Sequence, residues 1–534
     1  MATVRRLPDA VAYEFLGATV TYREFGQCID QVADGLAALG LRAGDRLTIA
    51  LPTSPQGVIA FYAALRLGAV CAMIHPLSTA PEVERLLTIS RSRIALTLDA
   101  LYDRFRGARA SGLLDTLILT HLADMLPPLR RLGFWLVQGR KIPRVPRDAP
   151  VRWWRELLAP HAPSAPRPVL ETNAMAGILF SGGTLGTPKG IMLSHRNFIA
   201  DGMQLAAWVG MREGDRVLAV LPLFHGFGLG ALVNAGFMHG ARVILVPRFS
   251  AEIVARLVRT KQPNMIAGVP TVYGAMIGDP NFRRARLACL KAAFSGGDAL
   301  PATVKQQFEQ LVMERGGSAR LLEGYGLTEA VTGVMVMPLH AARTGSVGLP
   351  LPDMLVSICG PGTDEELPDG EDGEICVHGP PVMLGYLDDP EATARSLVRH
   401  RDGRVWLHTE DLGHRDADGF FYFRGRLKRM IKSSGFNVYP AEVEQVIGQH
   451  AAVLEACVIG VPDRAQGERV RAFVVVRPGV TPSPALAEEI VAYCRDRLIK
   501  WSCPRDIEFL AEMPRTRLGK ADVRALAREG HQAA

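Results

Sequence analysis

The sequence predicts an α/β protein with a large, multi-layer N-terminal domain of mixed or parallel sheets, followed by a small α+β domain. Up to about residue 420, short apolar or β-branched runs alternate with amphipathic helical stretches, a pattern typical of helices layered on a substantially parallel sheet. Beyond Phe420 the chain changes to a small mixed unit. The 534 residues are enough for three or four compact units, and 48% apolar with 22% charged residues excludes a mainly disordered chain.

The elements of the large domain can be placed in order along the chain. We expect helices at 25–39 and 251–259, because apolar residues recur there at helical spacing. Strands are expected where apolar and β-branched residues cluster between such helices, at 46–51, 94–98, 178–180, 217–221 and 242–246. The apolar stretch 57–77 contains Arg66 and Gly68, so it indicates a helix followed by a strand and not a membrane span.

The small unit follows a strand at 421–423 and a charged connector at 426–428. We expect a helix from Pro440, strands at 457–461 and 471–476, and a helix at 484–498. The boundary is therefore predicted near Lys428, which divides the chain into domains 1–427 and 428–534. A unit of about 107 residues is large enough to fold as a domain of its own.

The net charge of +7 is concentrated in the segment 126–155. Its charged residues are the acid Asp148 and the bases Arg130, Arg131, Arg140, Lys141, Arg144, Arg147, Arg152 and Arg155. Its large aromatic residues are Phe134, Trp135, Trp153 and Trp154. Basic residues beside exposed aromatics, with Leu129, Leu132 and Leu136 as an apolar stripe, favour peripheral contact with an anionic membrane surface. The alternative is a solvated excursion whose aromatics cover its own domain. No recognised nucleic-acid-binding motif accompanies the charge, so we expect no nucleic-acid partner.

The N-terminal residues and the cysteines bear on the compartment of the protein. The first residues, MATVRRLPDA, lack the apolar core of a signal peptide, so we expect a cytoplasmic protein, with or without contact at a membrane surface. The eight cysteines contain no C-x-x-C pair and no Cys/His cluster with zinc spacing. We therefore expect buried thiols, with neither a disulfide framework nor a structural zinc site.

The segment with the strongest chemical signal is 176–200, which reads AGILFSGGTLGTPKGIMLSHRNFIA. A short apolar strand leads into a loop of glycines and hydroxyl residues, and a helix follows Ser194, which is a good N-cap. Backbone N–H groups of such a loop, together with hydroxyls and Lys189, can approach phosphate oxygens. Pro188 before the lysine and Gly190 after it do not fit a P-loop, which disfavours a P-loop NTPase.

Four further segments carry groups suited to a nucleotide. Glu323-Gly-Tyr-Gly-Leu-Thr-Glu329 offers the Thr328 hydroxyl to a phosphate and the Glu329 carboxylate to Mg²⁺. Trp406-Leu-His-Thr-Glu-Asp-Leu-Gly413 offers Asp411 to a ribose diol. The stretch 424–432 adds cations at the predicted domain junction, and Lys520 follows a glycine near the C-terminus.

Together and in this order, these segments resemble the acyl-adenylate-forming (AMP-forming) ligase superfamily, and most of all its fatty acid–CoA ligases. The resemblance extends from the Leu51-Pro-Thr-Ser54 region to Lys520. It implies that a carboxylic acid reacts with ATP and Mg²⁺ to give an acyl-AMP and pyrophosphate. The thiol of coenzyme A then displaces AMP. It also implies that the small domain is mobile and rotates about Lys428 between the two half-reactions.

The resemblance also implies a role for each matching residue. Lys520 would bridge the carboxylate and the phosphoryl and ribose oxygens, Glu329 would bind Mg²⁺, and Thr328 would contact phosphate. His225 matches a position near the carboxylate and the thiol path. The implied nucleotide- and thiol-binding residues are Ser181, Gly182, Gly183, Thr184, Gly186, Thr187 and Lys189 around pyrophosphate, Gly296, Gly297 and Tyr325 at adenine, Asp411 and Arg426 at ribose, and Lys432 and Gly435 at the thiol tunnel.

The chain departs from the family pattern at three positions. Gly182 replaces a common serine, as also in fatty-acid ligases, and Leu185 replaces a common threonine, so one hydroxyl donor is lost and a slower or weaker-binding first step is expected. Glu410 stands where the family usually has glycine before the ribose aspartate. If that backbone requires positive φ, the glutamate costs about 1–2 kcal/mol.

The residues that match the acid pocket are small or apolar: Gly226, Phe227, Gly228, Leu229, Gly230 and Gly333. No candidate counter-charge for an amino group accompanies them. Small residues leave room for an extended chain, so a medium- to long-chain fatty acid is the expected substrate, and an aryl acid is the alternative. Two other activities remain open: transfer of the acyl group to a carrier protein, and a non-catalytic homologue that binds nucleotide or lipid.

Overall fold

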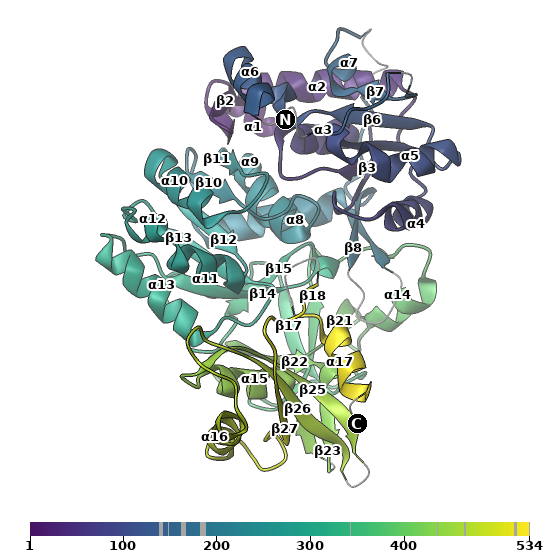
Figure 1. Cartoon of the computed structure of the whole chain (residues 1–534). Helices are drawn as coiled ribbons and strands as arrows, with labels where there is room; N and C mark the ends of the chain where they lie inside the picture. Colours follow the sequence, from purple (N-terminus) through teal and green to yellow (C-terminus); the bar gives the residue numbers. More distant parts are fainter. Residues whose placement is uncertain are drawn as a thin grey trace.

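The computed structural model describes residues 1–137, 142–147, 149–161, 167–181, 188–341, 343–434, 436–463, 466–516 and 521–532. It does not describe the side chains of 436–437 and 529–532. Several residues to which the sequence analysis assigns roles lie outside the described residues: Arg140, Lys141, Asp148, Gly182, Gly183, Thr184, Leu185, Gly186, Thr187, Gly435 and Lys520. Figure 1 shows the N-terminal layers at one end of the molecule and the C-terminal domain at the other.

The first large sheet has eight strands and is parallel over most of its width. Its strands, in spatial order, are β19 (Gly385–Tyr386), β9 (Lys189–Ser194), β8 (Met175–Ser181), β4 (Val70–Met73), β3 (Arg46–Ala50), β5 (Ile94–Leu98), β6 (Thr116–Thr120) and β7 (Arg152–Trp153). Only β9 and β19 run antiparallel to their neighbours. Its surrounding helices are α1 (Ala2–Arg6), α2 (Tyr22–Ala38), α3 (Pro55–Arg66), α4 (Ala80–Ser90), α5 (Tyr102–Ala110), α6 (Pro128–Val137) and α7 (Trp154–Leu157), with short 3-10 turns at Asp99–Leu101 and Leu122–Met125.

The second large sheet has nine strands, and its central strands are parallel. Their order is β16 (Leu349–Pro350), β15 (Gly333–Val336), β14 (Leu321–Gly326), β13 (Ala292–Gly296), β12 (Met265–Gly268), β10 (Arg216–Ala219), β11 (Arg242–Leu245), β1 (Val11–Phe15) and β2 (Ala18–Thr21). The connecting helices are α8 (His195–Trp208), the π-helix η4 (Phe227–Asn234), α9 (Ala235–His239), α10 (Ala251–Lys261), α11 (Pro270–Gly278), α12 (Pro280–Arg283), α13 (Ala302–Glu314) and the 3-10 turn η5 (Thr328–Ala330).

Two smaller sheets complete the molecule. An antiparallel sheet contains β17 (Leu355–Cys359), β18 (Gly373–His378), β21 (Val405–Arg415), β20 (Leu397–Arg399) and β22 (Phe421–Arg426), with α14 (Pro390–Ser396) beside it. The C-terminal domain follows the turn η6 (Leu427–Arg429). It contains β23 (Ile431–Ser433), β24 (Phe436–Val438), β25 (Val453–Asp463), β26 (Gly467–Val476), β27 (Asp506–Phe509), α15 (Pro440–Gly448), α16 (Pro484–Arg495) and α17 (Val523–Gln532). The α/β fold with a small C-terminal α+β domain, predicted from the sequence, is therefore confirmed.

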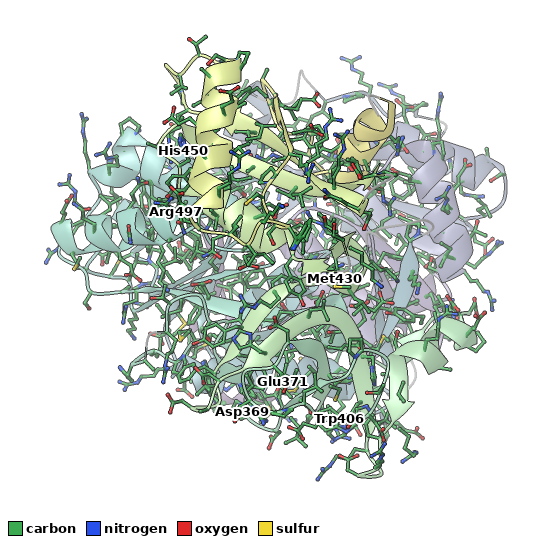
Figure 2. All side chains as sticks on the ribbon, turned by 90° about the horizontal axis from the view of Figure 1, so that it is seen from below. Asp369, Glu371, Trp406, Met430, His450 and Arg497 are labelled. Carbon is green, nitrogen blue, oxygen red and sulfur yellow. The ribbon has the colours of Figure 1, made fainter. Side chains whose placement is uncertain are left out.

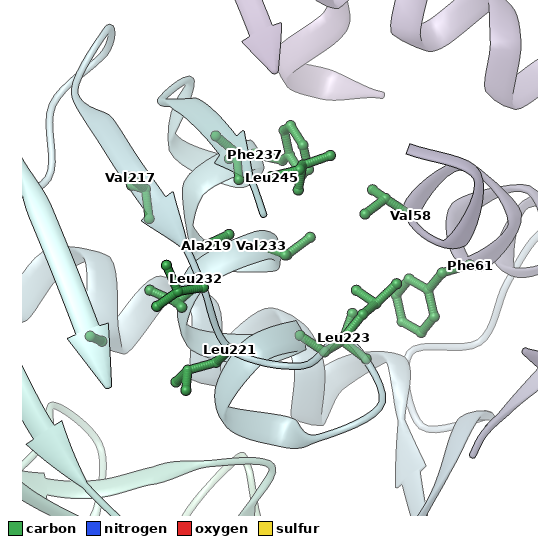
Figure 3. Packing of buried hydrophobic residues seen from close by; sticks show 14 of the residues in the cluster. Val58, Phe61, Val217, Ala219, Leu221, Leu223, Leu232, Val233, Phe237 and Leu245 are labelled. Carbon is green, nitrogen blue, oxygen red and sulfur yellow. The ribbon is translucent and has the colours of Figure 1, made fainter. Parts of the chain in front are cut away.

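One continuous apolar core joins the two large sheets, whereas residues from Ile431 onward form separate clusters. Figure 3 shows how the two layers meet: Leu223, just beyond β10, lies against Val58 and Phe61 of α3. All three side chains are almost completely buried. A Cβ on Gly57 would lie 2.6 Å from Leu223 Cδ2, so a larger residue there would displace the Leu223 side chain. This packing fixes the relative position of the layers that carry the candidate site.

The phosphate-loop segment contains one strand that the sequence analysis missed. Residues 189–194 form β9, which pairs antiparallel with β8, so the loop connects a β-hairpin and does not lead directly into a helix. The helix start is as predicted: α8 begins after Ser194, whose hydroxyl accepts the N–H of Asn197 at 3.1 Å. The short apolar run Ile191-Met192-Leu193 between Gly190 and Ser194 is the signal that β9 offered.

The basic segment exposes leucines, not its tryptophans. Trp154 is fully buried, and Trp153 stacks on His121 with ring centroids 4.9 Å apart, so these aromatics cover their own domain. On α6 the apolar side chains that face solvent are Leu129, Leu132, Leu136 and Val137, each at least 60% exposed. The expectation of exposed aromatics is therefore wrong for Trp154, whereas the expected leucine stripe is present. In the described part of the chain, no helix is both long and apolar enough to cross a membrane.

Candidate active site

A cluster of three side chains joins β14, β21 and β22, in which Tyr325 and Asp411 are buried and Arg426 is about half exposed. The Tyr325 hydroxyl donates to Asp411 Oδ2 at 2.8 Å, and Arg426 Nε lies 3.1 Å from Asp411 Oδ1. Asp411 is only 3% exposed, and the register of β21 with β22 places it directly opposite Arg426. Burial, and then the neighbouring Asp411 carboxylate, raise the pKa of Tyr325 well above its usual value. A carboxylate fixed in this way can accept the two hydroxyls of a diol while the tyrosine ring offers a flat platform.

Glu410, the residue before Asp411, has the positive φ under which the sequence analysis expected backbone strain. Glu410 has φ of 58°, in the left-handed region. Its N–H donates to Glu374 Oε1 at 2.9 Å, and its carboxylate lies 2.7 Å from Lys428 Nζ. The chain therefore carries about 1–2 kcal/mol of backbone strain beside Asp411. In return, the glutamate forms an ion pair with the residue that the family resemblance marks as the hinge.

Two substitutions at position 410 separate the strain from the ion pair. Glu410→Gln keeps the strained backbone and removes the charge, whereas Glu410→Gly removes both. Because glycine adopts positive φ without steric cost, we expect the glycine variant to have a free energy of unfolding about 1–2 kcal/mol higher than the glutamine variant. Chemical denaturation of the two proteins measures this difference. Equal stabilities would show that the left-handed backbone at this position carries no strain.

A second group of residues lies around Glu329 on η5. Glu329 Oε1 accepts the hydroxyl proton of Tyr386 at 3.0 Å, and its carbonyl oxygen accepts the N–H of Met383 at 2.7 Å. Lys189 Nζ lies 4.4 Å from the centre of the Tyr386 ring. Tyr386 thus bridges the acidic turn and the base of the phosphate-loop hairpin. The sequence analysis did not identify Tyr386, because it belongs to a two-residue strand far from the motifs.

The turn after Glu329 is strained and held by a buried carboxyl group. Val331, a β-branched residue, has φ of 62°. Asp201 on α8 accepts the N–H of Gly333 at 3.2 Å and is fully buried. Burial raises the pKa of Asp201 well above its usual value. Strained backbone of this kind persists only where the surrounding structure imposes it, and it is frequent at functional sites. Asp201 is a positioning residue that no sequence motif indicated.

The glycines assigned to the acid pocket do not leave open space. A Cβ on Gly226 would lie 1.8 Å from the Val331 carbonyl oxygen, and one on Gly228 would lie 2.1 Å from the Pro222 carbonyl oxygen. A Cβ on Gly230 would lie 2.5 Å from Asp201 Oδ2. These glycines permit close contact of the π-helix region with the strained turn. The interpretation that their small size makes room for an extended chain is therefore wrong.

The other described candidates occupy three places. Gly296 ends β13 beside Gly324, and Gly297 has φ of 81°, so a tight turn lies next to Tyr325. Ser181 and Lys189 are the last pair of the β8–β9 hairpin before its connecting loop. Thr328 lies on η5 with Glu329. His225 is half-buried, and its Nδ1 accepts the N–H of Phe227 at 3.2 Å.

Lys432 lies apart from the residues around Tyr325. It is exposed on β23 of the C-terminal domain, and its N–H donates to Glu468 Oε2 at 2.8 Å. The structure therefore brings Tyr325, Asp411 and Arg426 together, and separately Glu329 and Lys189 through Tyr386. It does not bring Lys432 into contact with either group.

Fold and geometry together define a two-domain enzyme whose large domain can present a diol acceptor, an aromatic platform and an isolated carboxylate to a nucleotide. Residues 2–387 match the family described as AMP-binding enzyme, and residues 442–520 match its C-terminal domain. The chain is 35% identical to a long-chain-fatty-acid–CoA ligase of Bacillus subtilis over 98% of its own length and 92% of that protein.

Two solved structures show the same fold over nearly the whole chain. The anthranilate CoA ligase AuaEII, in complex with anthranoyl-AMP, has a TM-score of 0.86 and 25% identity, and the match covers 100% of this chain and 97% of that one. ATP-bound MatB from Rhodopseudomonas palustris has a TM-score of 0.85 and 26% identity, covering 99% and 98%. The chain belongs to the AMP-binding enzyme family and is an AMP-forming acid–CoA ligase of that family.

Proposed function

We propose that the enzyme is an ATP-dependent fatty acid–CoA ligase that acts on medium- to long-chain acids. The observation that carries the proposal is the Tyr325–Asp411–Arg426 cluster, whose buried carboxylate and tyrosine suit a nucleoside. The match to a fatty-acid ligase over nearly the full chain supports the choice of acid. The match to an anthranilate ligase, with lower identity, keeps the aryl acid as the alternative to be tested.

In this proposal, the described site residues divide the nucleotide among them. Asp411 accepts the ribose hydroxyls, Arg426 fixes the Asp411 carboxylate, and the Tyr325 ring packs on adenine beside the Gly296–Gly297 turn. Lys189, with Ser181 and the loop between them, surrounds the pyrophosphate. Thr328 donates its hydroxyl to a phosphate oxygen.

The donor set at Glu329 fits Mg²⁺. It is one carboxylate at the edge of a polar turn, and Mg²⁺ in nucleotide sites takes one or two carboxylates, water and phosphate oxygens. Bound there, Mg²⁺ would neutralise phosphate charge. The Tyr386 hydroxyl, 3.0 Å from Glu329 Oε1, orients the carboxylate.

The chemistry then requires charge neutralisation more than acid–base catalysis. A carboxylate oxygen forms a bond to the α-phosphorus of ATP, the α–β phosphoanhydride bond breaks, and pyrophosphate leaves. Because an anion attacks an anion, cations and N–H donors that oppose the developing charge supply most of the rate enhancement. Lys520 contributes the cation nearest the new bond. In the second half-reaction the coenzyme A sulfur bonds to the acyl carbon and AMP leaves, with His225 beside that path and Lys432 and Gly435 facing the thiol.

We also propose that residues 428–534 rotate as a unit about Lys428 between the half-reactions. Two features support this: the C-terminal residues have apolar clusters of their own, and Lys428 lies on the short turn η6 between β22 and β23. The Glu410–Lys428 ion pair crosses this junction, with both side chains about half exposed. Such exposed pairs are worth at most about 1 kcal/mol, so the pair can break during rotation.

Competition between acids tests the substrate proposal. With saturating ATP and coenzyme A, we expect kcat/KM for AMP formation to rise with chain length across saturated acids. Each added methylene that enters an apolar site contributes up to about 0.8 kcal/mol, or roughly fourfold. Benzoate, anthranilate and ferulate serve as the aryl comparison. A higher kcat/KM for an aryl acid than for every fatty acid would replace the fatty acid as substrate while leaving the ligase chemistry intact.

We propose that this cytoplasmic enzyme meets an anionic membrane surface through α6. The exposed Leu129, Leu132 and Leu136 form the apolar stripe. Two nearby arginines make internal contacts: Arg130 Nη1 donates to the Leu16 carbonyl at 2.7 Å, and Arg155 pairs with Asp124 at 3.0 Å. The leucines are therefore the stronger determinant of contact.

Vesicle co-sedimentation tests the membrane proposal. Replacing Leu132 and Leu136 together by serine is expected to lower partitioning onto phosphatidylserine-containing vesicles by roughly tenfold or more, because two leucines no longer enter the bilayer surface. Leu454→Ser, at a leucine 55% exposed on the C-terminal domain, is the matched control and should not change binding. Equal partitioning of the double variant and the control would contradict a role for α6.

A further inference from the structure

A cluster of soft ligand atoms lies on the sheet of β17, β18, β20 and β21, outside the nucleotide-binding residues. The register pairs Cys376 on β18 with His408 on β21, and His400 directly follows β20. One ligand atom from each of these three residues lies within 4.8 Å of the others, and all three residues are buried. The sequence analysis found no zinc-type spacing because the sheet register, not local spacing, brings these residues together.

The distance between the two imidazoles is close to that of a metal site, whereas the Cys376 thiol contacts the other ring nitrogen of His408. His400 Nε2 and His408 Nε2 are 2.9 Å apart, and Cys376 Sγ lies 3.6 Å from His408 Nδ1. Two imidazole ligands of a tetrahedral zinc ion are about 3.3 Å apart, given Zn–N bonds near 2.0–2.1 Å. A few tenths of an ångström of opening would therefore admit the ion between the two histidines. The His400 ring is held in place by stacking on Trp406, with ring centroids 5.3 Å apart.

A second thiol, Cys359, lies beside the cluster but outside the group whose ligand atoms lie within 4.8 Å of one another, so it would have to move to become a fourth ligand. Ser357 and Cys359 alternate on β17, and Ser357 pairs directly with Cys376, so Cys359 lies on the same face one pleat further along. Cys359 is 1% exposed, and its Sγ lies 3.6 Å from Ser357 Oγ. Two cysteines and two histidines form the donor set that structural zinc sites use, and thiolate and imidazole donors disfavour hard ions such as Mg²⁺.

Glu374 contacts His408 next to the cluster. Glu374 Oε2 lies 2.9 Å from His408 Nδ1. A histidine that donates its Nδ1 proton to a carboxylate presents Nε2 to a metal, and such carboxylate–histidine pairs are the usual support of zinc ligands. Glu374 Oε1 also accepts the N–H of Glu410, so the same carboxylate holds the backbone next to Asp411. An ion bound here would therefore order the strand that carries the proposed ribose ligand.

A cavity of about 590 Å³ lies beside the cluster and reaches His400 and Cys359, but Cys376 and His408 are not part of its lining. Its lining includes Ser357, Cys359, His400 and Trp406, together with the acidic residues Asp364 and Glu366. Figure 2 labels Trp406 on this part of the molecule, well separated in that view from His450 and Arg497 of the C-terminal domain. Arginines also line this cavity, and they pair with both carboxylates: Arg401 with Asp364 and Arg415 with Glu366.

We propose that Cys359, Cys376, His400 and His408 bind one Zn²⁺ ion, with Glu374 as the supporting carboxylate of His408. The ion would tie β17, β18, β20 and β21 together in a structural role. This site is separate from the Mg²⁺ proposed at Glu329.

Cobalt substitution tests the site in the full-length enzyme. After treatment with a chelator, the protein is titrated with Co²⁺ and then with Zn²⁺. We expect one Co²⁺ per chain, with the d–d bands of a tetrahedral ion and a thiolate-to-cobalt charge-transfer band, both lost when Zn²⁺ displaces it. His400→Gln and Cys376→Ser should each weaken Zn²⁺ binding by more than about tenfold, since loss of even a supporting residue costs 10–100-fold. None of these readouts depends on ATP or an acid, so failure here is distinct from failure of the proposed ligase activity.

The control variants each replace a cysteine or a histidine outside the proposed zinc site. Cys494→Ser, at a buried thiol of the C-terminal domain, and His340→Gln, at an exposed histidine, should leave metal binding unchanged. If Cys376→Ser does not fold, His400→Gln at the cavity wall carries the test. An octahedral cobalt spectrum without the thiolate band would overturn the proposal. So would unchanged affinity in His400→Gln, or a Cys359–Cys376 disulfide in the freshly isolated enzyme.

Discussion

Replacing Lys520 by alanine is expected to slow acyl-AMP formation by between about 100- and 1,000-fold, the usual cost of removing one group that stabilises developing charge. The reason is electrostatic: the lysine is the proposed cation at the new bond between carboxylate and phosphorus. Transfer of a preformed acyl group from acyl-AMP to coenzyme A should keep most of its rate, because no anion attacks a phosphate in that step. Stopped-flow measurement of each half-reaction separates the two.

Lys500→Ala is the matched control, since Lys500 is an exposed lysine of the same domain whose Nζ lies 5.2 Å from the Trp501 ring centre. It should change neither half-reaction. If Lys520→Ala and Lys500→Ala formed acyl-AMP at the same rate, the role assigned to Lys520 would be wrong.

Asp411→Asn is expected to raise the KM for ATP by roughly 10- to 100-fold. Asparagine keeps the shape but removes the charge that pairs with Arg426 at 3.1 Å and accepts from Tyr325 at 2.8 Å. Hydrogen bonds to charged groups are worth about 1.5–3 kcal/mol, which corresponds to this range. Steady-state kinetics with ATP and the acid varied in turn give the result, and the KM of the acid should change much less.

The control for Asp411 is Glu371→Gln, an exposed carboxylate labelled in Figure 2. Melting temperatures of both variants show whether any kinetic change reflects unfolding. If the KM for ATP were unchanged in a folded Asp411→Asn enzyme, Asp411 would not bind the ribose. The Tyr325 cluster would then have only a structural role.

The sequence predicted what depends on local pattern. The short apolar runs became strands such as β3 and β5 close to their expected limits, and Ser194 caps α8 as its side chain suggested. The sequence analysis considered positive φ at Glu410 as a condition, because the family places glycine there, and the structure meets this condition. In each case the information lies within a few residues of the feature.

The sequence analysis did not predict contacts between residues that lie far apart along the chain. Tyr386 reaches Glu329 from a strand 57 residues away, and Asp201 holds a turn 132 residues further along the chain. Cys376 and His408, two of the proposed zinc ligands, meet only because β18 and β21 pair. The interpretation of the acid-pocket glycines was wrong for a related reason. A glycine can leave open space or can allow close contact with another segment, and this depends on neighbouring atoms that the sequence does not place.

The most direct test is isotope exchange between pyrophosphate and ATP in the absence of coenzyme A. An enzyme that activates carboxylates as adenylates must re-form ATP from acyl-AMP and labelled pyrophosphate, so exchange should appear only when a fatty acid is present and should vanish in Lys520→Ala. Exchange that needs no acid, or ATP hydrolysis to phosphate with no exchange under any acid, would contradict the proposal that the nucleotide site serves carboxylate activation.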